Sequence, residues 1–153
     1  MSLKLSFSWI GIVVFALPML INIIYAIFPP VGDAVSSKKV MRPAEIIENV
    51  SRAAYLVLLT VLASKNSLKM QSVWLMAAAL FLVLYYIVWI RYFAGGRDVA
   101  LLKKSFLFVP IPLAVFPVLY FLCAAVWLGN LPAAISAVIF GAAHITVSVQ
   151  SFR

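Results

Sequence analysis

The chain has 153 residues, of which 66% are hydrophobic and 10% charged, and its mean hydropathy is +1.14. Soluble domains are about half apolar and a quarter charged, so this composition excludes a soluble enzyme, a disordered tail and a small secreted module. The formal net charge of +8 indicates basic loops that face anionic lipid, and no soluble domain remains to bind nucleic acid. The single Cys123 excludes an intrachain disulfide and a CxxC redox pair.

Five apolar segments have the length of about 20 residues that a membrane-spanning helix needs. They cover residues 7–28, 44–63, 72–92, 106–128 and 132–150. The remaining residues are too few for a domain outside the membrane. The sequence therefore predicts an all-α protein whose residues 1–153 form a single transmembrane domain, a five-helix bundle.

The first segment ends in Phe28-Pro29-Pro30 without a small-residue cleavage site, so we interpret it as a retained span and not as a signal peptide. The second segment carries Glu45, Glu48, Asn49 and Arg52 in its first half. It either crosses the membrane or lies along its surface, and the distribution of basic residues favours crossing.

With five spans, the basic residues divide three to nine between the two sides of the membrane. One side has Lys4, Lys65 and Lys69, and the other has Lys38, Lys39, Arg42, Arg52, Arg91, Arg97, Lys103, Lys104 and Arg153. Without the second span the division is six to six, which the positive-inside rule disfavours. We therefore expect the N-terminus outside the cell and the C-terminus in the cytoplasm.

Polar residues from several segments coincide in the cytoplasmic third of the predicted bundle. Glu48, Arg52, Arg91 and His144 form a candidate polar vestibule open to the inner leaflet. Charged residues inside a membrane are costly, so such a group is either paired internally or functional.

Each member also has a structural interpretation. Glu48 and Arg52 are spaced i, i+4, which favours an internal ion pair over a direct contact with substrate or lipid phosphate. His144 is expected to donate to a carbonyl that Pro110 or Pro112 leaves without its helical partner, the alternative being a proton relay. Together with Pro117, these prolines are expected to bend the fourth helix or to open a cavity in it.

Two further features predict contacts rather than chemistry. Arg97, Lys103 and Lys104, near the Gly95-Gly96 turn, are candidate contacts for anionic lipid headgroups. Ala133, Ala137 and Gly141 form a small-residue stripe suited to close helix packing. Motifs for metal ligands are absent from the sequence, and we expect neither a metal nor a cofactor.

Three stretches carry a resemblance to other proteins. They are residues 21–30 (INIIYAIFPP), residues 85–97 (YYIVWIRYFAGGR), and residues 110–120 (PIPLAVFPVLY) together with 141–148 (GAAHITVS). The chain resembles small, uncharacterised integral membrane proteins of Gram-positive bacteria. That resemblance implies a bacterial cytoplasmic membrane location and no assigned activity.

Two functions remain open at this point. We favour a non-enzymatic bundle, either an accessory subunit or a small self-associating carrier, whose small-residue stripe meets a partner or a second copy. The alternative is a membrane enzyme or binder for an anionic lipid or isoprenoid at the cytoplasmic leaflet. In it, arginines would hold a phosphate or carboxylate, and His144 or Glu48 would act as acid or base.

Overall fold

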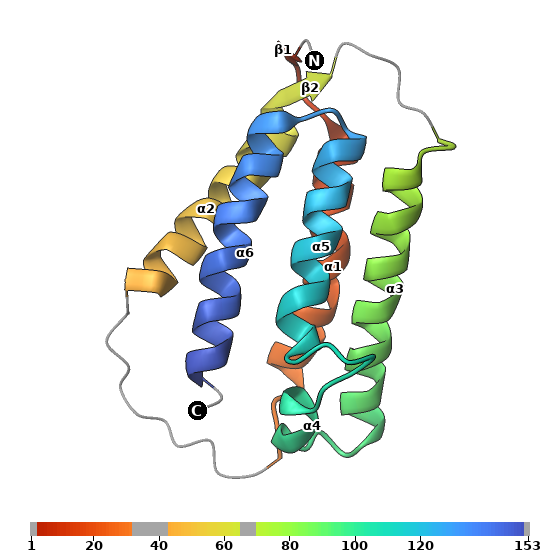
Figure 1. The fold of residues 1–153 in the computed structure, drawn as a ribbon, viewed down its shortest axis with the longest axis vertical. Coiled ribbons are helices and arrows are strands. Elements are labelled where there is room, and N and C mark those ends of the chain that lie inside the picture. The colour runs from red at the N-terminus through yellow and green to blue at the C-terminus, as the bar shows by residue number, and fades with distance from the viewer. Residues whose placement is uncertain (1–2, 32–42, 65–69, 152–153) are drawn as a thin grey trace.

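A computed structural model describes residues 3–31, 43–64 and 70–151 (Figure 1). Within these residues 77% are helical. The helices are α1 (Trp9–Ile27), α2 (Pro43–Val61), α3 (Val73–Ala94), α4 (Val99–Lys103), α5 (Pro112–Trp127) and α6 (Leu131–Ser151). Two short strands, β1 (Leu3–Leu5) and β2 (Leu62–Ser64), complete the described elements.

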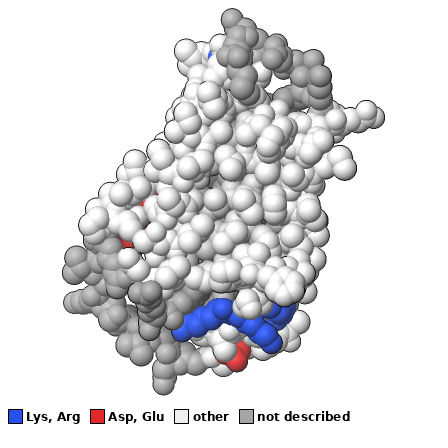
Figure 2. All heavy atoms as spheres, in the orientation of Figure 1, with Lys and Arg blue, Asp and Glu red and all other residues white. Residues whose placement is uncertain are grey.

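The five long helices run side by side and alternate in direction (Figure 1). α6 lies between α2 and α5, and α3 packs on the other side of α5, while α1 contacts α2, α3 and α5. The tight turn at Gly129 and Asn130 makes α5 and α6 antiparallel neighbours. The short α4 lies at the end opposite the strands, where Figure 2 shows Lys and Arg side chains gathered.

Three described helices are long and apolar enough to cross a membrane, namely α1, α3 and α6. This indicates a membrane protein. α5 is apolar but has 16 residues, or about 24 Å at 1.5 Å per residue, which is less than the hydrocarbon core of about 30 Å. α2 is not among the three, because its first half carries the polar residues noted above.

The fourth predicted helix is shorter than expected. Its predicted start, Phe106, pairs with Val109 in an isolated bridge, and α5 begins only at Pro112. A proline disfavours helical geometry in the residue before it, so Pro110 and Pro112 together stop the helix from extending toward Phe106. Pro110 therefore lies outside the helix, and Pro112 occupies the first turn, where its missing N–H costs nothing. Only Pro117 lies inside α5.

Two elements were not predicted from the sequence. β1 and β2 pair antiparallel, with Lys4 opposite Ala63, so α2 ends at Val61 and the chain extends from there. α4 begins with Asp98, whose carboxylate accepts a hydrogen bond from the Ala100 amide at 2.8 Å. Both elements are too short to show a hydrophobic period in the sequence.

A proline inside α1 is compensated by a neighbouring helix. Pro18 lacks the N–H that would otherwise bind the carbonyl of Val14, four residues earlier. The hydroxyl of Tyr120 on α5 donates to that carbonyl at 2.8 Å, and Tyr120 is 3% exposed. Membrane helices tolerate proline where a side chain satisfies the freed carbonyl in this way.

The register between α2 and α6 is fixed by buried side chains. Asn130 donates to the carbonyls of Leu58 and Leu62 at 2.8 and 2.9 Å, and its own carbonyl oxygen accepts from the Ala133 amide at 3.1 Å. Farther along, the Ser136 hydroxyl donates to the carbonyl of Ser51 at 2.8 Å. Two helices held at these points have little freedom to slide past each other.

Candidate functional site

Polar side chains in the half of the bundle nearer α4 gather around one pocket of about 160 Å³, which we call the inner pocket. All five long helices contribute to its wall. Its polar lining residues are Asn22, Arg52, Tyr85, His144 and Ser148, and its aromatic ones include Trp89, Phe121 and Phe140. The pocket combines a polar side on α2 and α6 with an apolar body.

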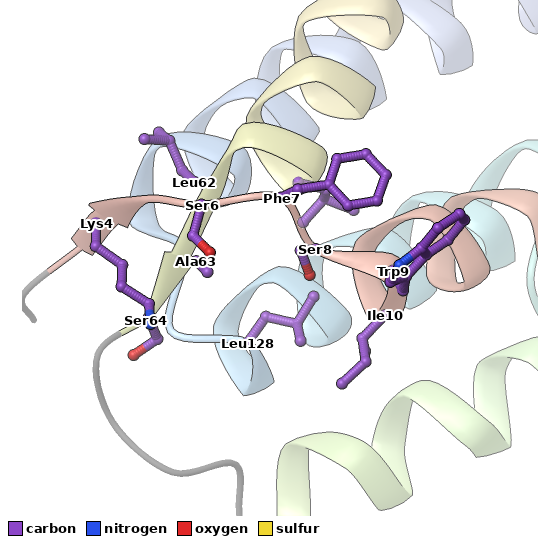
Figure 3. A pocket seen from close by; sticks show the side chains of 11 residues that line it. Lys4, Ser6, Phe7, Ser8, Trp9, Ile10, Leu62, Ala63, Ser64 and Leu128 are labelled. Carbon is purple, nitrogen blue, oxygen red and sulfur yellow. The ribbon is translucent and has the colours of Figure 1, made fainter.

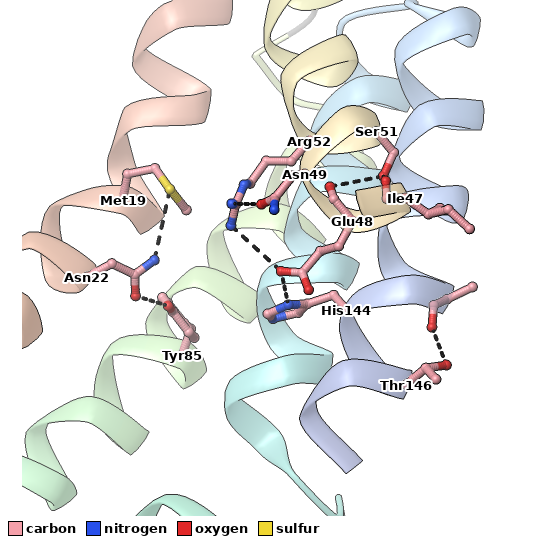
Figure 4. Close-up of polar contacts among 11 residues, drawn as sticks. Met19, Asn22, Ile47, Glu48, Asn49, Ser51, Arg52, Tyr85, His144 and Thr146 are labelled. Carbon is pink, nitrogen blue, oxygen red and sulfur yellow. Dashed lines mark hydrogen bonds and ion pairs between the residues drawn. The ribbon is translucent and has the colours of Figure 1, made fainter. Parts of the chain in front are cut away.

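An acid–base pair connects α2 and α6 beside this pocket. Nδ1 of His144 lies 3.0 Å from Oε1 of Glu48, and the two side chains are 24% and 11% exposed (Figure 4). The His144 ring also stacks on Phe140, with centroids 5.1 Å apart. Since Glu48 accepts the hydrogen bond, the neutral histidine carries its proton on Nδ1 and leaves Nε2 as an acceptor.

The partner of His144 differs from the expected one. We expected a carbonyl freed by Pro110 or Pro112, but those prolines do not interrupt a helix, and Nδ1 binds Glu48. The compensating hydrogen bond occurs instead at Pro18 in α1, through Tyr120. The prediction for His144 was wrong, because its ring binds a carboxylate on α2 and not a backbone carbonyl on α5.

Arg52 extends from α2 toward the pocket, one turn after Glu48 (Figure 4). Its guanidinium donates to Oδ1 of Asn49 at 2.6 Å and lies 3.7 Å from the Glu48 carboxylate. The ion pair has the i, i+4 spacing seen in the sequence. With 38% of its side chain exposed, Arg52 has room to contact a further anion.

Across the pocket, two residues that the sequence analysis missed bring polar atoms to the wall. The Tyr85 hydroxyl on α3 donates to Oδ1 of Asn22 on α1 at 2.9 Å (Figure 4). Asn22 also directs its amide toward the sulfur of Met19 at 3.9 Å. An asparagine within an apolar span was the available signal, because a polar residue at that depth needs a partner.

Arg91 makes its contacts elsewhere. Its guanidinium donates to the carbonyls of Leu101, Lys104 and Ser105 at 3.1, 2.8 and 3.2 Å, and lies 5.6 Å from the Phe106 ring centroid. It therefore holds the α3–α4 corner. The structure brings Glu48, Arg52 and His144 together, and we call these three the inner cluster.

The other basic candidates lie at the α4 end. Arg97 adopts a positive φ of 63° in the turn after α3, and its carbonyl accepts from the Val31 amide at 3.4 Å. Lys103 and Lys104 end α4 and are exposed. Six basic residues of the orientation argument, Lys38, Lys39, Arg42, Lys65, Lys69 and Arg153, lie outside the described residues.

The small-residue stripe packs against this chain's own helices. Ala133 and Ala137 are fully buried, and a Cβ placed on Gly141 would lie 2.4 Å from Cγ1 of Val118 on α5. The stripe is therefore covered within the bundle and is not a surface for a second copy.

A larger pocket of about 360 Å³ lies at the opposite end, beside β1 and β2 (Figure 3). Phe7 and Trp9 border it and are 60% and 72% exposed, as is typical of aromatic residues at a membrane–water interface. Its Ser8 hydroxyl accepts from the Gly11 amide at 3.1 Å and so caps α1. Ser8 caps a helix, and Phe7 and Trp9 have the exposure of interfacial aromatic residues. The inner pocket, which gathers Arg52 and His144, is therefore the stronger candidate site.

Comparisons with known proteins assign no activity to this arrangement. No known protein family, curated protein or solved structure matches the chain. Among the described residues, no group of three or more His, Cys, Asp or Glu side chains could hold a metal ion. The function is therefore argued from the inner pocket itself.

Proposed function

We propose that this chain is a non-enzymatic multi-pass membrane protein that binds the anionic group of a small, largely apolar ligand in its inner pocket. In this proposal all five long helices cross the cytoplasmic membrane of a bacterium. The N-terminus is outside, and α4 faces the cytoplasm. The pocket then opens in the half of the bundle nearer the inner leaflet.

The observation that carries the proposal is the convergence of Arg52 and His144 on one pocket wall. Two groups that can carry positive charge, placed beside aromatic side chains, suit a ligand with an anionic head and an apolar body. Internal pairing explains why Glu48 tolerates its depth. Two further polar residues, Asn22 and Tyr85, line the same pocket from α1 and α3 and satisfy each other by a hydrogen bond, so they add polar atoms to its wall.

The proposal is for binding and does not include a catalytic step. Glu48 is engaged by His144 at 3.0 Å, so its carboxylate is not free to attack or to deprotonate a substrate. The small-residue stripe is covered inside the bundle, so this proposal does not rely on a partner docked there.

A set of benzene derivatives tests the charge requirement. A cavity of 150 Å³ holds a benzene molecule, so ligands of this size suit a pocket of about 160 Å³. Calorimetry with the purified protein in a neutral detergent should detect benzoate or phenyl phosphate, whereas neutral benzamide should bind at least tenfold more weakly. Equal binding of benzamide, or no binding of either anion, would contradict the proposal.

A matched pair of variants tests the place of binding. Arg52→Gln should weaken anion binding about tenfold, which corresponds to about 1.4 kcal/mol. Lys104→Gln removes the same charge from an exposed position at the same end of the bundle and should change the affinity less than twofold. Equal losses in both variants would show that general surface charge, and not the pocket, attracts the anion.

The threading through the membrane has its own test. In a Cys123→Ala background, single cysteines at Ser6 and Ser151 should react differently with a membrane-impermeant maleimide added to intact cells. The cysteine at position 6 should be labelled, and the one at position 151 only after permeabilisation. Labelling of both in intact cells would exclude an odd number of spans.

A further inference from the structure

The charges of the inner cluster limit what the pocket accepts. With His144 neutral, the cluster holds one negative and one positive group, Glu48 and Arg52, and its net charge is zero. An unpaired charge in a low-dielectric site is costly, so a bound anion must be matched by a positive charge gained at the same time. Arg52 already faces Glu48 and does not supply that charge by itself.

His144 is the side chain of the cluster that can gain a positive charge, because its Nε2 is left as an acceptor for a proton. Nδ1 is occupied by Glu48 at 3.0 Å, so the added proton binds at Nε2. The resulting imidazolium keeps its hydrogen bond to Glu48, and the cluster then carries one positive charge. A single negative charge on the ligand restores neutrality.

Other groups around His144 are consistent with this assignment. Its surroundings contain these side chains: Glu48 and Arg52 from α2, Tyr85 from α3, the neutral Asn22 from α1, the apolar Pro117 and Phe121 from α5, and Phe140 and Ser148 from α6. Glu45, one turn before Glu48, adds negative charge near the cluster without lining the pocket. That charge opposes an anion entering without a proton.

We infer that the inner pocket takes up a small monocarboxylate together with one proton, which His144 holds. This inference rests on the proposed function and specifies its ligand. A carboxylate brings one negative charge, whereas a phosphate ester brings up to two and leaves the site negatively charged. The pocket volume of about 160 Å³ admits a body of roughly the size of a benzene ring.

Calorimetry of benzoate binding in two buffers of different ionisation enthalpy counts the protons taken up. Benzoate stays ionised throughout the range from pH 6.5 to 8.5, so any proton uptake belongs to the protein. We expect up to one proton to be taken up per benzoate, and the affinity should fall about tenfold per pH unit wherever a full proton is taken up. Phenyl phosphate should bind at least tenfold more weakly than benzoate at pH 8.

The His144→Gln variant cannot gain the matching charge, so it should bind benzoate at least tenfold more weakly than the unmodified protein at pH 6.5. Its remaining binding should involve no proton uptake and show no pH dependence. Should this variant fail to fold, the proton count on the unmodified protein still decides the question. Benzoate binding without proton uptake would overturn the inference and leave the proposed function standing. Absence of binding by every anion would overturn both.

A further arm distinguishes the source of the carboxylate. Dodecanoate, tested in nanodiscs of neutral lipid, represents a membrane amphiphile, and benzoate represents a ligand from the aqueous phase. The proton is counted with benzoate, because a fatty acid in lipid itself binds protons near neutral pH. The tighter of the two probes identifies the source, and binding of benzoate without a proton refutes the inference.

Discussion

The hydrogen bond between Tyr120 and the Val14 carbonyl should be energetically coupled to Pro18. The change to make is Tyr120→Phe, which removes only the hydroxyl and leaves the carbonyl without a donor, because Pro18 has no N–H. Interhelical hydrogen bonds in membranes contribute about 0.6 kcal/mol on average and up to about 1.7 kcal/mol. A buried acceptor left unsatisfied costs about 1–3 kcal/mol, so we expect a loss of about 1.5 kcal/mol.

The double-mutant cycle with Pro18→Ala separates this cause from general loss of packing. Alanine at position 18 supplies an N–H for Val14, so Tyr120→Phe should then cost only about 0.5 kcal/mol. Unfolding in mixed micelles, followed by tryptophan fluorescence and by labelling of the buried Cys123, measures both values. Equal costs in the two backgrounds would refute the reasoning. Tyr86→Phe is the control. Its hydroxyl also donates to a carbonyl of α1, that of Leu17, but this carbonyl has a helical donor in the amide of Ile21.

Three more substitutions test the described contacts. Asn130→Ala removes three hydrogen bonds and should lower the free energy of unfolding by about 2 kcal/mol in the same assay, and a loss below about 0.5 kcal/mol would contradict the role given to it. Gly11→Ala places a Cβ against the Leu59 backbone carbonyl and should cost about 1–3 kcal/mol, more than Gly141→Ala, whose Cβ meets a side chain. Arg91→Lys should speed hydrogen exchange at residues 101–105, because lysine cannot donate to three carbonyls in Arg91's geometry. Benzoate affinity should stay within twofold, because Arg91 does not line the inner pocket. Unchanged exchange would show that the corner does not depend on the guanidinium.

The candidate site shows where sequence reasoning reached its limit. The i, i+4 spacing of Glu48 and Arg52 is a local property of one helix, so their contact was predictable. The pairing of Glu48 with His144 joins residues 96 positions apart. It depends on the rotation and register of α2 against α6, which Asn130 and Ser136 fix by contacts that no periodic pattern encodes.

Arg91 was expected in the polar vestibule, but it makes its contacts elsewhere. Residue counts placed it at the end of the third segment, just below the layer of Glu48, Arg52 and His144, and depth was the only coordinate that they supplied. Its direction around the helix axis and the position of α4 decided its partners, and both led it to the carbonyls of the α3–α4 corner. The small-residue stripe similarly predicted close packing but not which helix would fill it.

The sequence by itself determined that this is a helical membrane protein, and it gave the approximate positions of the long helices. Burial of apolar residues in lipid and satisfaction of backbone hydrogen bonds within each segment act locally, so composition and segment length express them directly. Only the tertiary structure decided the late start of α5, the strand pair, the tyrosine that compensates for Pro18, and the five-helix pocket around Arg52 and His144. These features depend on which side chains meet across helices, and that is set by packing between residues far apart in the chain.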